Sequence, residues 1–344
     1  MELFNLGRVP WADSQLIYHA LARLGRPALS LVSPASPYVC LGFHQDARHE
    51  VDLDFCENQG LPVFRREVGG GAVFLDGNQL FFQLVLPQDH PEITPNRESF
   101  YRKFLDPVVR VYRRLGIAAL FRPINDVVVE NRKISGTGVG EIGDCVVLVG
   151  NLILDFDYRT MARVLRVPDE KFRDKVHKTI QENLSTIRRE LGEERAAEWS
   201  EAGLNALLAE EFGRILGPLV PAQADAALRA EMDRLKSWML TPEWLLRKGR
   251  RYDRRQIKIR AGLHVVHKVH KAPGGLIRAV FDLDEGRIRN LELSGDFFAY
   301  PPEALAGLEA ALEGTTPAEA EEKLQAFYRS GRVETPGVKV SDWL

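Results

Sequence analysis

Three consecutive glycines follow a pair of arginines in RREVGGGAVF, residues 65–74, between two strand-like apolar runs. Glycine has no Cβ atom, so successive backbone N–H groups of such a turn can approach an anion closely, and arginine adds charge-assisted donors. The segment therefore has the composition of a phosphate cradle. A glycine-rich turn with solvated arginines explains the same residues, and the segment alone does not decide between the two.

A second segment, NDVVVENRKISG at residues 125–136, places Lys133 at the start of a strand with a Ser-Gly turn directly behind it. A lysine in that position could direct a point charge at a carboxylate or a phosphate. Asp126 opens the neighbouring strand and could hold Mg²⁺. A surface hairpin without chemistry accounts for the same pattern, so both interpretations remain open.

The run GVGEIG, residues 138–143, formally fits the dinucleotide fingerprint GxGxxG. That fingerprint requires a helix directly behind it, because the helix N-terminus receives the pyrophosphate. The residues that follow, DCVVLVGNLIL, have the pattern of a strand. We therefore exclude a dinucleotide site and expect these glycines to lie in a mobile loop after Lys133.

The histidines and cysteines indicate no further site. His264, His267 and His270 are spaced by three, which on a strand places the middle side chain on the opposite face and disfavours a shared metal. Cys145 lies in an apolar run with no histidine nearby and is interpreted as a buried strand thiol. A basic run at residues 247–260 is either a solvated face or a docking surface for an acidic partner.

The composition excludes several classes of protein. The chain has 344 residues, of which 45% are hydrophobic and 27% charged, and its net charge is -2, so we expect about two ordered domains and no nucleic-acid partner. No apolar stretch approaches the roughly 20 residues of a membrane span, and no leader pattern opens the chain, which predicts a cytoplasmic protein without membrane contact. The three cysteines lack CxxC spacing, which argues against a disulfide framework.

Apolar periodicity and turn residues predict the elements that must position these segments. The predicted helices lie at 12–24 (capped by Asp13 or Ser14), 100–115, 204–215 and 228–238, with two more after the last strand, the second capped by Thr316. The predicted strands lie at 28–32, 38–41, 62–65, 72–75, 81–86, 127–129, 133–135, 145–154, 257–269, 276–283 and 288–293. The linker GPLVPAQAD sets the boundary between a domain at 1–220 and a second at 221–344.

Several of these segments together resemble a known family. RREVGGGAVFLDGN, INDVVVENRKISG and GNLILDFD resemble, in order and spacing, the motifs of lipoate-protein ligases of the A type, within the lipoate/biotin ligase and octanoyltransferase superfamily. TPEWLLRKG and LSGDFF resemble the C-terminal accessory domain of such ligases. The resemblance implies an α/β (α+β) fold with a mixed, mainly antiparallel sheet in the catalytic domain, and a small α/β accessory domain.

The resemblance also implies a reaction. Lipoate and Mg·ATP would form lipoyl-AMP, and a lysine of an apo lipoyl domain, or of a glycine-cleavage H-type protein, would then take the acyl group. Lys133 matches the catalytic lysine, and Asp126 matches a metal-binding position. The positions that match residues binding ATP and the acyl-adenylate are Arg66, Gly69, Gly70, Gly71, Ala72, Val73, Phe74, Asn78, Asn125 and Lys133.

Two other functions fit this resemblance less directly. An octanoyl or lipoyl transferase works without ATP, and those with a catalytic cysteine place it shortly upstream of the motif lysine, where this chain has Ile124-Asn125-Asp126. A non-catalytic lipoyl-domain binding protein would have no use for the arginine, the glycines and the lysine together. The chain also departs from the usual family residues at Val68, Leu75, Gly140 and Val149, which leaves the preferred acyl group open.

Overall fold

The fold is described from a computed structural model that describes all residues except 95, 168–171, 250–262 and 332. The chain forms two compact units. Unit 1 comprises Met1–Cys40, Val51–Phe64 and Val73–Thr241, and unit 2 comprises Leu41–Glu50, Arg65–Ala72 and Pro242–Leu344. Two short segments from the first part of the chain thus belong to the same compact unit as the C-terminal part. A single boundary in the sequence does not separate the two units. The functional domains at 1–220 and 221–344 stay a prediction.

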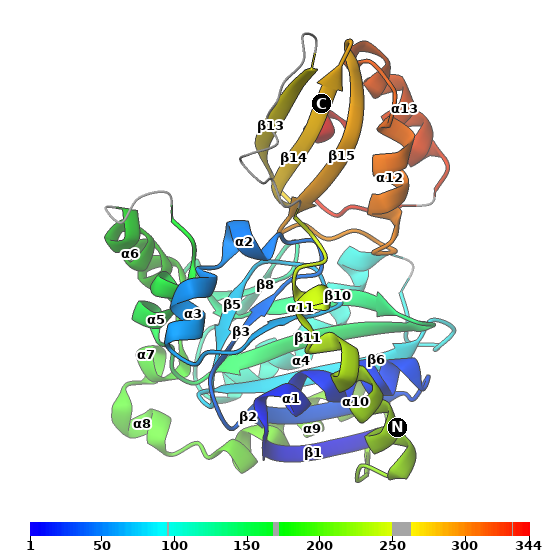
Figure 1. Cartoon of the computed structure of the whole chain (residues 1–344). Coiled ribbons are helices and arrows are strands. Elements are labelled where there is room, and N and C mark those ends of the chain that lie inside the picture. The colour runs from blue at the N-terminus through cyan, green and yellow to red at the C-terminus, as the bar shows by residue number, and fades with distance from the viewer. Residues whose placement is uncertain (95, 168–171, 250–262, 332) are drawn as a thin grey trace. The chain divides into compact units, whose positions relative to one another are not determined.

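A six-stranded mixed sheet forms the centre of unit 1 (Figure 1). Its order is β10-β11-β6-β2-β1-β12, and only the pairings of β1 with β2 and of β1 with β12 are parallel. The strands are β1 (Glu2–Val9), β2 (Ala28–Pro34), β6 (Gln79–Pro87), β10 (Thr137–Ile142), β11 (Cys145–Ile153) and β12 (Val220–Pro221). The central strands β2 and β6 read as nearly continuous apolar runs because both faces of the sheet are covered. The predicted mixed, mainly antiparallel sheet is confirmed.

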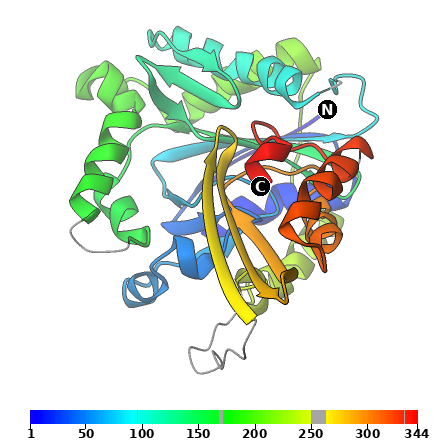
Figure 2. The ribbon, with the colours of Figure 1, turned by 90° about the horizontal axis from the view of Figure 1, so that it is seen from above.

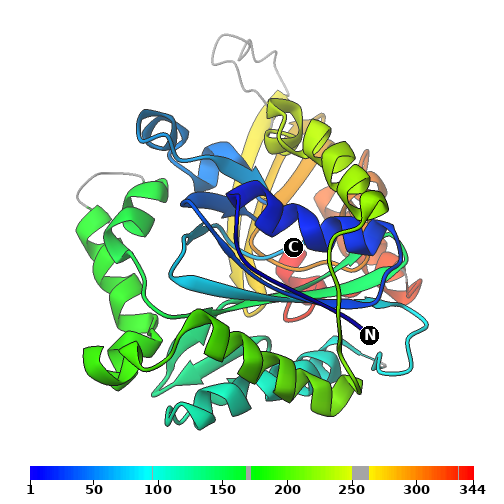
Figure 3. The same cartoon turned by 90° about the horizontal axis from the view of Figure 1, so that it is seen from below.

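Helices cover both faces of this sheet (Figure 3). α1 (Trp11–Arg23) and α10 (Ala226–Met239) lie side by side on one face, and α9 (Glu201–Leu216), with α4 (Arg97–Arg114) packed on it, lies on the other. The predicted cap of the first helix is wrong. α1 begins directly after Pro10, and the Ser14 hydroxyl lies inside the helix, where it donates to the Trp11 carbonyl.

Shorter elements complete the part of the chain before the C-terminal sheet. Two three-stranded sheets have the orders β4-β3-β5 and β7-β8-β9. Their strands are β3 (Tyr38–Leu41), β4 (Val63–Arg65), β5 (Val73–Leu75), β7 (Leu120–Arg122), β8 (Asp126–Val129) and β9 (Arg132–Ser135). The short helices are α2 (Ala47–Glu50), α3 (Leu53–Asn58), α5 (Tyr158–Val164), α6 (Arg173–Asn183), α7 (Ile187–Leu191), α8 (Glu193–Ala197) and α11 (Pro242–Leu245).

Unit 2 contains an antiparallel sheet with two helices on one face (Figure 2). The strands β13 (Leu263–Ala272), β14 (Gly275–Asp284) and β15 (Arg287–Gly295) follow one another in the sheet, and a 3-10 helix occupies Val340–Trp343. α12 (Ala304–Leu312) and α13 (Pro317–Arg329) bury Leu305, Leu308 and Leu324 in a core shared with the sheet. The predicted cap of α13 is confirmed, since Thr316 and Glu319 form a reciprocal capping box.

Two features of unit 1 correct the expectations from sequence. The glycines of GVGEIG are not a mobile loop: Gly138 and Gly140 lie in β10 and pair with Val149 and Val147 of β11. The neighbouring strand thus imposes an extended conformation that the local composition does not favour. The predicted strand directly behind these glycines is confirmed, since β11 follows them. β1, the other feature, was not expected at all.

Candidate functional site

Lys133 lies on a tight hairpin, as the sequence predicts. Glu130 and Asn131 form the turn between β8 and β9, and both have positive φ, +45° and +66°, as a type I′ hairpin turn requires. The pairing shifts between Val127 and Val128, so that β9 contains one extra residue at this point. Such a bulge bends the strand and redirects its side chains.

The ammonium of Lys133 is paired with a carboxylate. Its Nζ lies 2.9 Å from Asp126 Oδ1, and Arg122 Nη2 lies 2.9 Å from Asp126 Oδ2. Burial would raise the pKa of the Asp126 carboxyl, but the nearby Lys133 and Arg122 cations outweigh it, and the pKa lies below the usual range. The lysine side chain is still 35% exposed. Two cations and one anion leave a net positive charge within reach of solvent.

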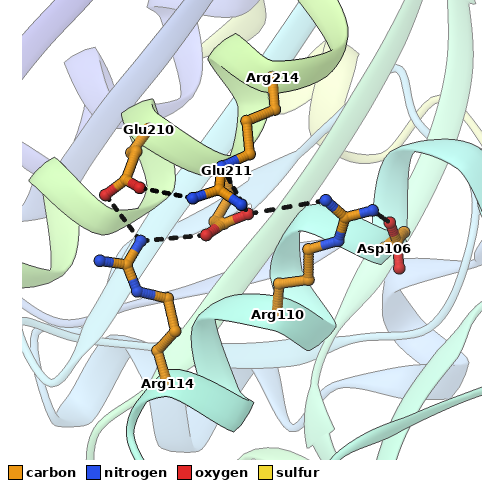
Figure 4. A network of polar contacts seen from close by, with 6 residues as sticks. All are labelled: Asp106, Arg110, Arg114, Glu210, Glu211 and Arg214. Atoms are coloured by element: carbon orange, nitrogen blue, oxygen red, sulfur yellow. Dashed lines mark hydrogen bonds and ion pairs between the residues drawn. The ribbon is translucent and has the colours of Figure 1, made fainter.

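Helix α4 supports this hairpin from behind. Tyr112 donates its hydroxyl to the Ile134 carbonyl at 2.6 Å, and the Tyr101 hydroxyl accepts from the Val139 N–H at 2.8 Å. A network of ion pairs joins α4 to α9 around the carboxylate of Glu211, whose side chain is only 2% exposed (Figure 4). Its members are Asp106, Arg110, Arg114, Glu210, Glu211 and Arg214. The base of the hairpin is therefore a well-anchored helix.

Backbone and amide groups hold the hairpin at its sides. The Ser185 N–H donates to the Lys133 carbonyl at 2.8 Å. The Asn125 amide donates to the Thr137 carbonyl at 2.8 Å, and the Thr137 hydroxyl donates back to the Asn125 carbonyl. The Asn125 Nδ2 group and carbonyl thus close the loop before β8, and the binding role of this residue stays a prediction.

Two buried amides were missed from sequence. Asn151 Oδ1 accepts from the Gly136 N–H at 2.8 Å, and its Nδ2 donates to Gln79 Oε1 at 2.7 Å. Gln79 Nε2 in turn donates to the carbonyl of Phe74 at 3.1 Å. Local patterns carry no signal for this contact, although buried amides on two apolar strands are themselves unusual and call for partners.

Asn78 and Phe74 line a cavity of about 460 Å³ in unit 1. The Asp76 carboxylate accepts from the Asn78 N–H at 2.9 Å and so closes the turn before β6. Burial is the main cause that raises the pKa of Asp76. The other residues of the lining are Arg8, Ala35, Ser36, Pro37, Phe55, Gln59, Leu61, Gly77, Asp157 and Thr160.

In unit 2, the first arginine of the glycine-rich segment is a structural residue. Arg65 is fully buried, and its guanidinium donates to four backbone carbonyls of the unit. The acceptors are Gly42, Phe43, Gln45 and Leu245, at 2.6–3.1 Å. Trp244 Nε1 donates to the Arg65 carbonyl at 2.9 Å. This side chain holds three separate stretches of chain together, so neither solvation nor phosphate binding describes it.

The glycines of this segment differ from one another. Arg66 curls back on the turn and donates to the carbonyls of Gly69 and Gly71 at 2.7 and 3.0 Å. Gly70 has φ +90°, and a Cβ at Gly69 or Gly70 would lie 2.9 or 3.1 Å from the Phe298 ring. A Cβ at Gly71 would meet only Asp296 Cβ, at 3.8 Å. Packing therefore requires the first two glycines but not the third.

The remaining candidates show little reactive chemistry. No group of three or more His, Cys, Asp or Glu that could hold a metal occurs in the described part of the chain. Both oxygens of Asp126 face cations, Arg122 and Lys133, and its role as a magnesium ligand stays a prediction. His270 pairs with Asp342 at 3.2 Å, and the side chain of His264 is not among those described. All three cysteines are buried.

The basic run at 247–260 is described only at its start. Arg247 lies over the rings of Phe43 and Trp244, and Lys248 pairs with Glu309 at 3.1 Å. Residues 250–262, which contain most of its charge, lie outside the described residues.

Every helix that the structure does describe is too short or too polar to cross a bilayer.

Comparisons with known proteins place this hairpin and this glycine-rich segment in one family. Residues 8–212 match the family model of the lipoyl protein ligase A/B catalytic domain. The chain belongs to this family. The match includes both chemistry-bearing segments, and the predicted resemblance to lipoate-protein ligases of the A type is confirmed.

The relatives of this family member are ligases and transferases. The octanoyltransferase LipM of Kyrpidia tusciae is 29% identical over 64% of this chain and 88% of its own length. Lipoate-protein ligase A subunit 1 of Thermoplasma acidophilum is 33% identical over 52% of this chain and 71% of its own length. The solved structure of the bipartite lipoate protein ligase of that organism superimposes with a TM-score of 0.64 at 26% identity, covering 71% of this chain and 95% of its own. The chain is an enzyme of the lipoate ligase superfamily.

Proposed function

We propose that this lipoyl ligase family member is an ATP-dependent lipoate ligase. The observation that supports this choice is that its three cysteines are buried and therefore poorly placed to act as nucleophiles. Burial raises the pKa of the Cys56 thiol to about 11 and also raises the pKa of the Cys145 thiol, and Cys40 is buried as well. A transferase that forms a thioester needs an accessible thiolate, which none of the three offers.

In the first step, a carboxylate oxygen of lipoate attacks the α-phosphorus of ATP, and the bond from that phosphorus to pyrophosphate breaks. Negative charge grows on the phosphorus oxygens as this happens. The Lys133 ammonium supplies a fixed positive charge to stabilise them and the carboxylate that attacks. Because the Asp126 carboxylate and the β8–β9 turn already hold this cation in place, little reorganisation is needed in the transition state.

In the second step, the amine of the acceptor lysine attacks the acyl carbonyl of lipoyl-AMP. An amide forms, the bond from the acyl carbon to AMP breaks, and the amine loses a proton. The acceptor we propose is an apo lipoyl domain or a glycine-cleavage H-type protein. The solved Thermoplasma ligase, whose structural study includes its E2 lipoyl domain, supports the first of these.

The glycine-rich segment has a separate role in this proposal. Gly71 and Ala72 are half-buried, in contrast to the buried Gly69 and Gly70, so their N–H groups are the accessible ones for nucleotide phosphates. Arg66 adds a charge at the same turn. Val73 and Phe74 continue into β5, and Asn78 follows at its end. Magnesium enters as part of the substrate Mg·ATP, and the chain's own residues carry out the steps above.

The test is lipoate-dependent exchange of labelled pyrophosphate into ATP by the purified protein. A ligase that forms lipoyl-AMP reversibly returns the label to ATP, whereas a transferase or a binding protein does not. The alternative function, octanoyl or lipoyl transfer without ATP, is favoured by the similarity to LipM. Absence of exchange, together with acyl transfer from an octanoylated carrier, would establish that alternative.

A further inference from the structure

Asn151 and Gln79 form a one-way chain of hydrogen bonds between two segments far apart in sequence. Gly136 donates to Asn151 at 2.8 Å, Asn151 donates to Gln79 at 2.7 Å, and Gln79 donates to the Phe74 carbonyl at 3.1 Å. This series of hydrogen bonds begins at Gly136, in the turn that follows Lys133 and β9, and ends at Phe74 on β5. Hydrogen bonds that run in one direction polarise and strengthen each other.

The environment of the two amides leaves them few alternatives. Gln79 is 1% exposed and Asn151 is 8% exposed, on the adjacent strands β6 and β11. Asn151 also bonds to the hairpin through its backbone: the Ser135 hydroxyl donates to its carbonyl at 2.5 Å, and its N–H donates to Gly136 at 3.2 Å. With so little water nearby, each amide has to use its protein partners.

The seam between β11 and the hairpin is also closely packed. A Cβ on Gly150 would lie 2.3 Å from the Phe82 ring and 3.0 Å from the Gly136 carbonyl oxygen. Only glycine at this position lets the hairpin approach β11 so closely. The hairpin therefore packs against β11 in a single defined position, and the Asn151 amide lies at this contact.

We propose that Gln79 and Asn151 are positioning residues: this amide pair fixes the Lys133 hairpin against β5 and so sets the place of the lysine cation. The inference rests on the proposed function in taking Lys133 as the reacting cation. Neither amide touches a substrate in this proposal. Both act through the hairpin and the strand that they connect.

Conservative substitutions can remove single hydrogen bonds from this series. Gln79→Glu keeps an oxygen to accept from Asn151 but replaces the donor that faces the Phe74 carbonyl. Asn151→Asp keeps the acceptor for Gly136 and replaces the donor that faces Gln79. The matched control is Gln83→Glu, a glutamine on the same strand with the same 1% exposure, whose amide donates instead to the Ser14 carbonyl.

Hydrogen exchange of the hairpin amides at residues 132–140 tests the positioning directly. We expect exchange about tenfold faster in Gln79→Glu and Asn151→Asp than in the wild type, and unchanged rates in Gln83→Glu. Only the first two substitutions break a hydrogen bond that holds the hairpin in place. Equal exchange in Gln79→Glu and Gln83→Glu would overturn the inference. This measurement needs no enzymatic activity, so it decides the question even if the wild type exchanges no pyrophosphate and the proposed function fails.

Kinetics of pyrophosphate exchange provide the second readout. We expect Gln79→Glu to lower kcat about tenfold with little change in the KM for ATP, since the chemistry and not the nucleotide contact is disturbed. The same substitution should add almost nothing in a Lys133→Ala background, because the pair acts through that lysine. Additive losses in the double variant would show that the amide pair acts independently of Lys133 and would overturn the inference.

Discussion

In the glycine-rich segment of unit 2, the guanidinium groups of Arg65 and Arg66 donate to backbone carbonyls of their own surroundings. In the hairpin of unit 1, the Lys133 ammonium pairs with the Asp126 carboxylate and stays partly exposed. Carbonyl partners fix a guanidinium in a structural position. A single carboxylate shared by two cations holds the lysine but leaves net charge for a ligand.

The comparison shows that the residues of such motifs have two kinds of role: some hold the fold together, and others are available to bind or act on a ligand. Arg65, Gly69 and Gly70 are required by the packing of unit 2. A Cβ at Gly71, in contrast, would make only one ordinary contact, and the ammonium of Lys133 stays partly exposed beside Asp126. Substitutions of the first kind should change stability, and those of the second kind should change activity.

Arg65→Met should have the largest effect on stability. The methionine fills much of the space but leaves four buried carbonyls without their donor, which should cost roughly 4 kcal/mol in the free energy of unfolding. Arg66→Met is the matched control, because its side chain is half-buried and donates to two carbonyls of its own turn. Urea unfolding of both variants measures the difference, and equal losses would contradict the structural role of Arg65.

Lys133→Ala should have the largest effect on activity. Loss of one preorganised charge should remove about 3 kcal/mol of transition-state stabilisation, roughly a hundredfold in the rate of pyrophosphate exchange. The melting temperature should fall only slightly, since the side chain is partly exposed and its ion pair with Asp126 contributes little to stability. Lys103→Ala is a matched control, because that lysine is similarly exposed and pairs with Glu92. Near wild-type exchange by Lys133→Ala would refute the assignment of this lysine.

The sequence predicted those elements whose signals are local. The turn at Glu130 and Asn131, the strand Tyr38–Leu41 and the cap at Thr316 all follow from neighbouring residues, and the structure confirms them. Periodicity and turn chemistry act within a few residues, so one sequence suffices to read them.

Features that depend on distant partners were missed. Gln79 and Asn151 meet across 72 positions, and Arg65 reaches Leu245 across 180. A buried arginine contradicts the usual exposure of charged residues and becomes favourable only when carbonyls from remote segments surround it. Strand β10 likewise exists because β11 pairs with it, which no local glycine pattern can indicate.

Alanine at the second and third glycines should separate packing from ligand binding. Gly70→Ala should lower the free energy of unfolding by about 1–2 kcal/mol, because an L-residue is strained at φ +90° and its Cβ meets Phe298. Gly71→Ala should leave unfolding unchanged and weaken ATP-dependent exchange several-fold. Thermal melting and the KM for ATP measure the two effects. If Gly71→Ala melted early but bound ATP normally, the third glycine would also belong to the packing.

The pairing of Asp126 with Lys133 predicts the smallest effect, a pH dependence of stability. The folded state holds the pKa of this carboxyl below its unfolded value of about 3.8, so the unfolded state binds the proton more readily. The stabilisation from the ion pair is therefore complete above the unfolded pKa and is lost as the pH falls through the folded one.

Asp126→Asn removes this contribution. Its deficit in unfolding free energy relative to the wild type should thus be constant from pH 7 to pH 5 and shrink as the pH drops below about 4. Urea unfolding across this range measures the deficit, with Asp106→Asn as the control, since Asp106 is a half-buried carboxylate paired with Arg110. A deficit that grew on acidification would mean that the carboxyl is not held ionised by its two cations, and the contrast between hairpin and glycine-rich segment would lose its electrostatic basis.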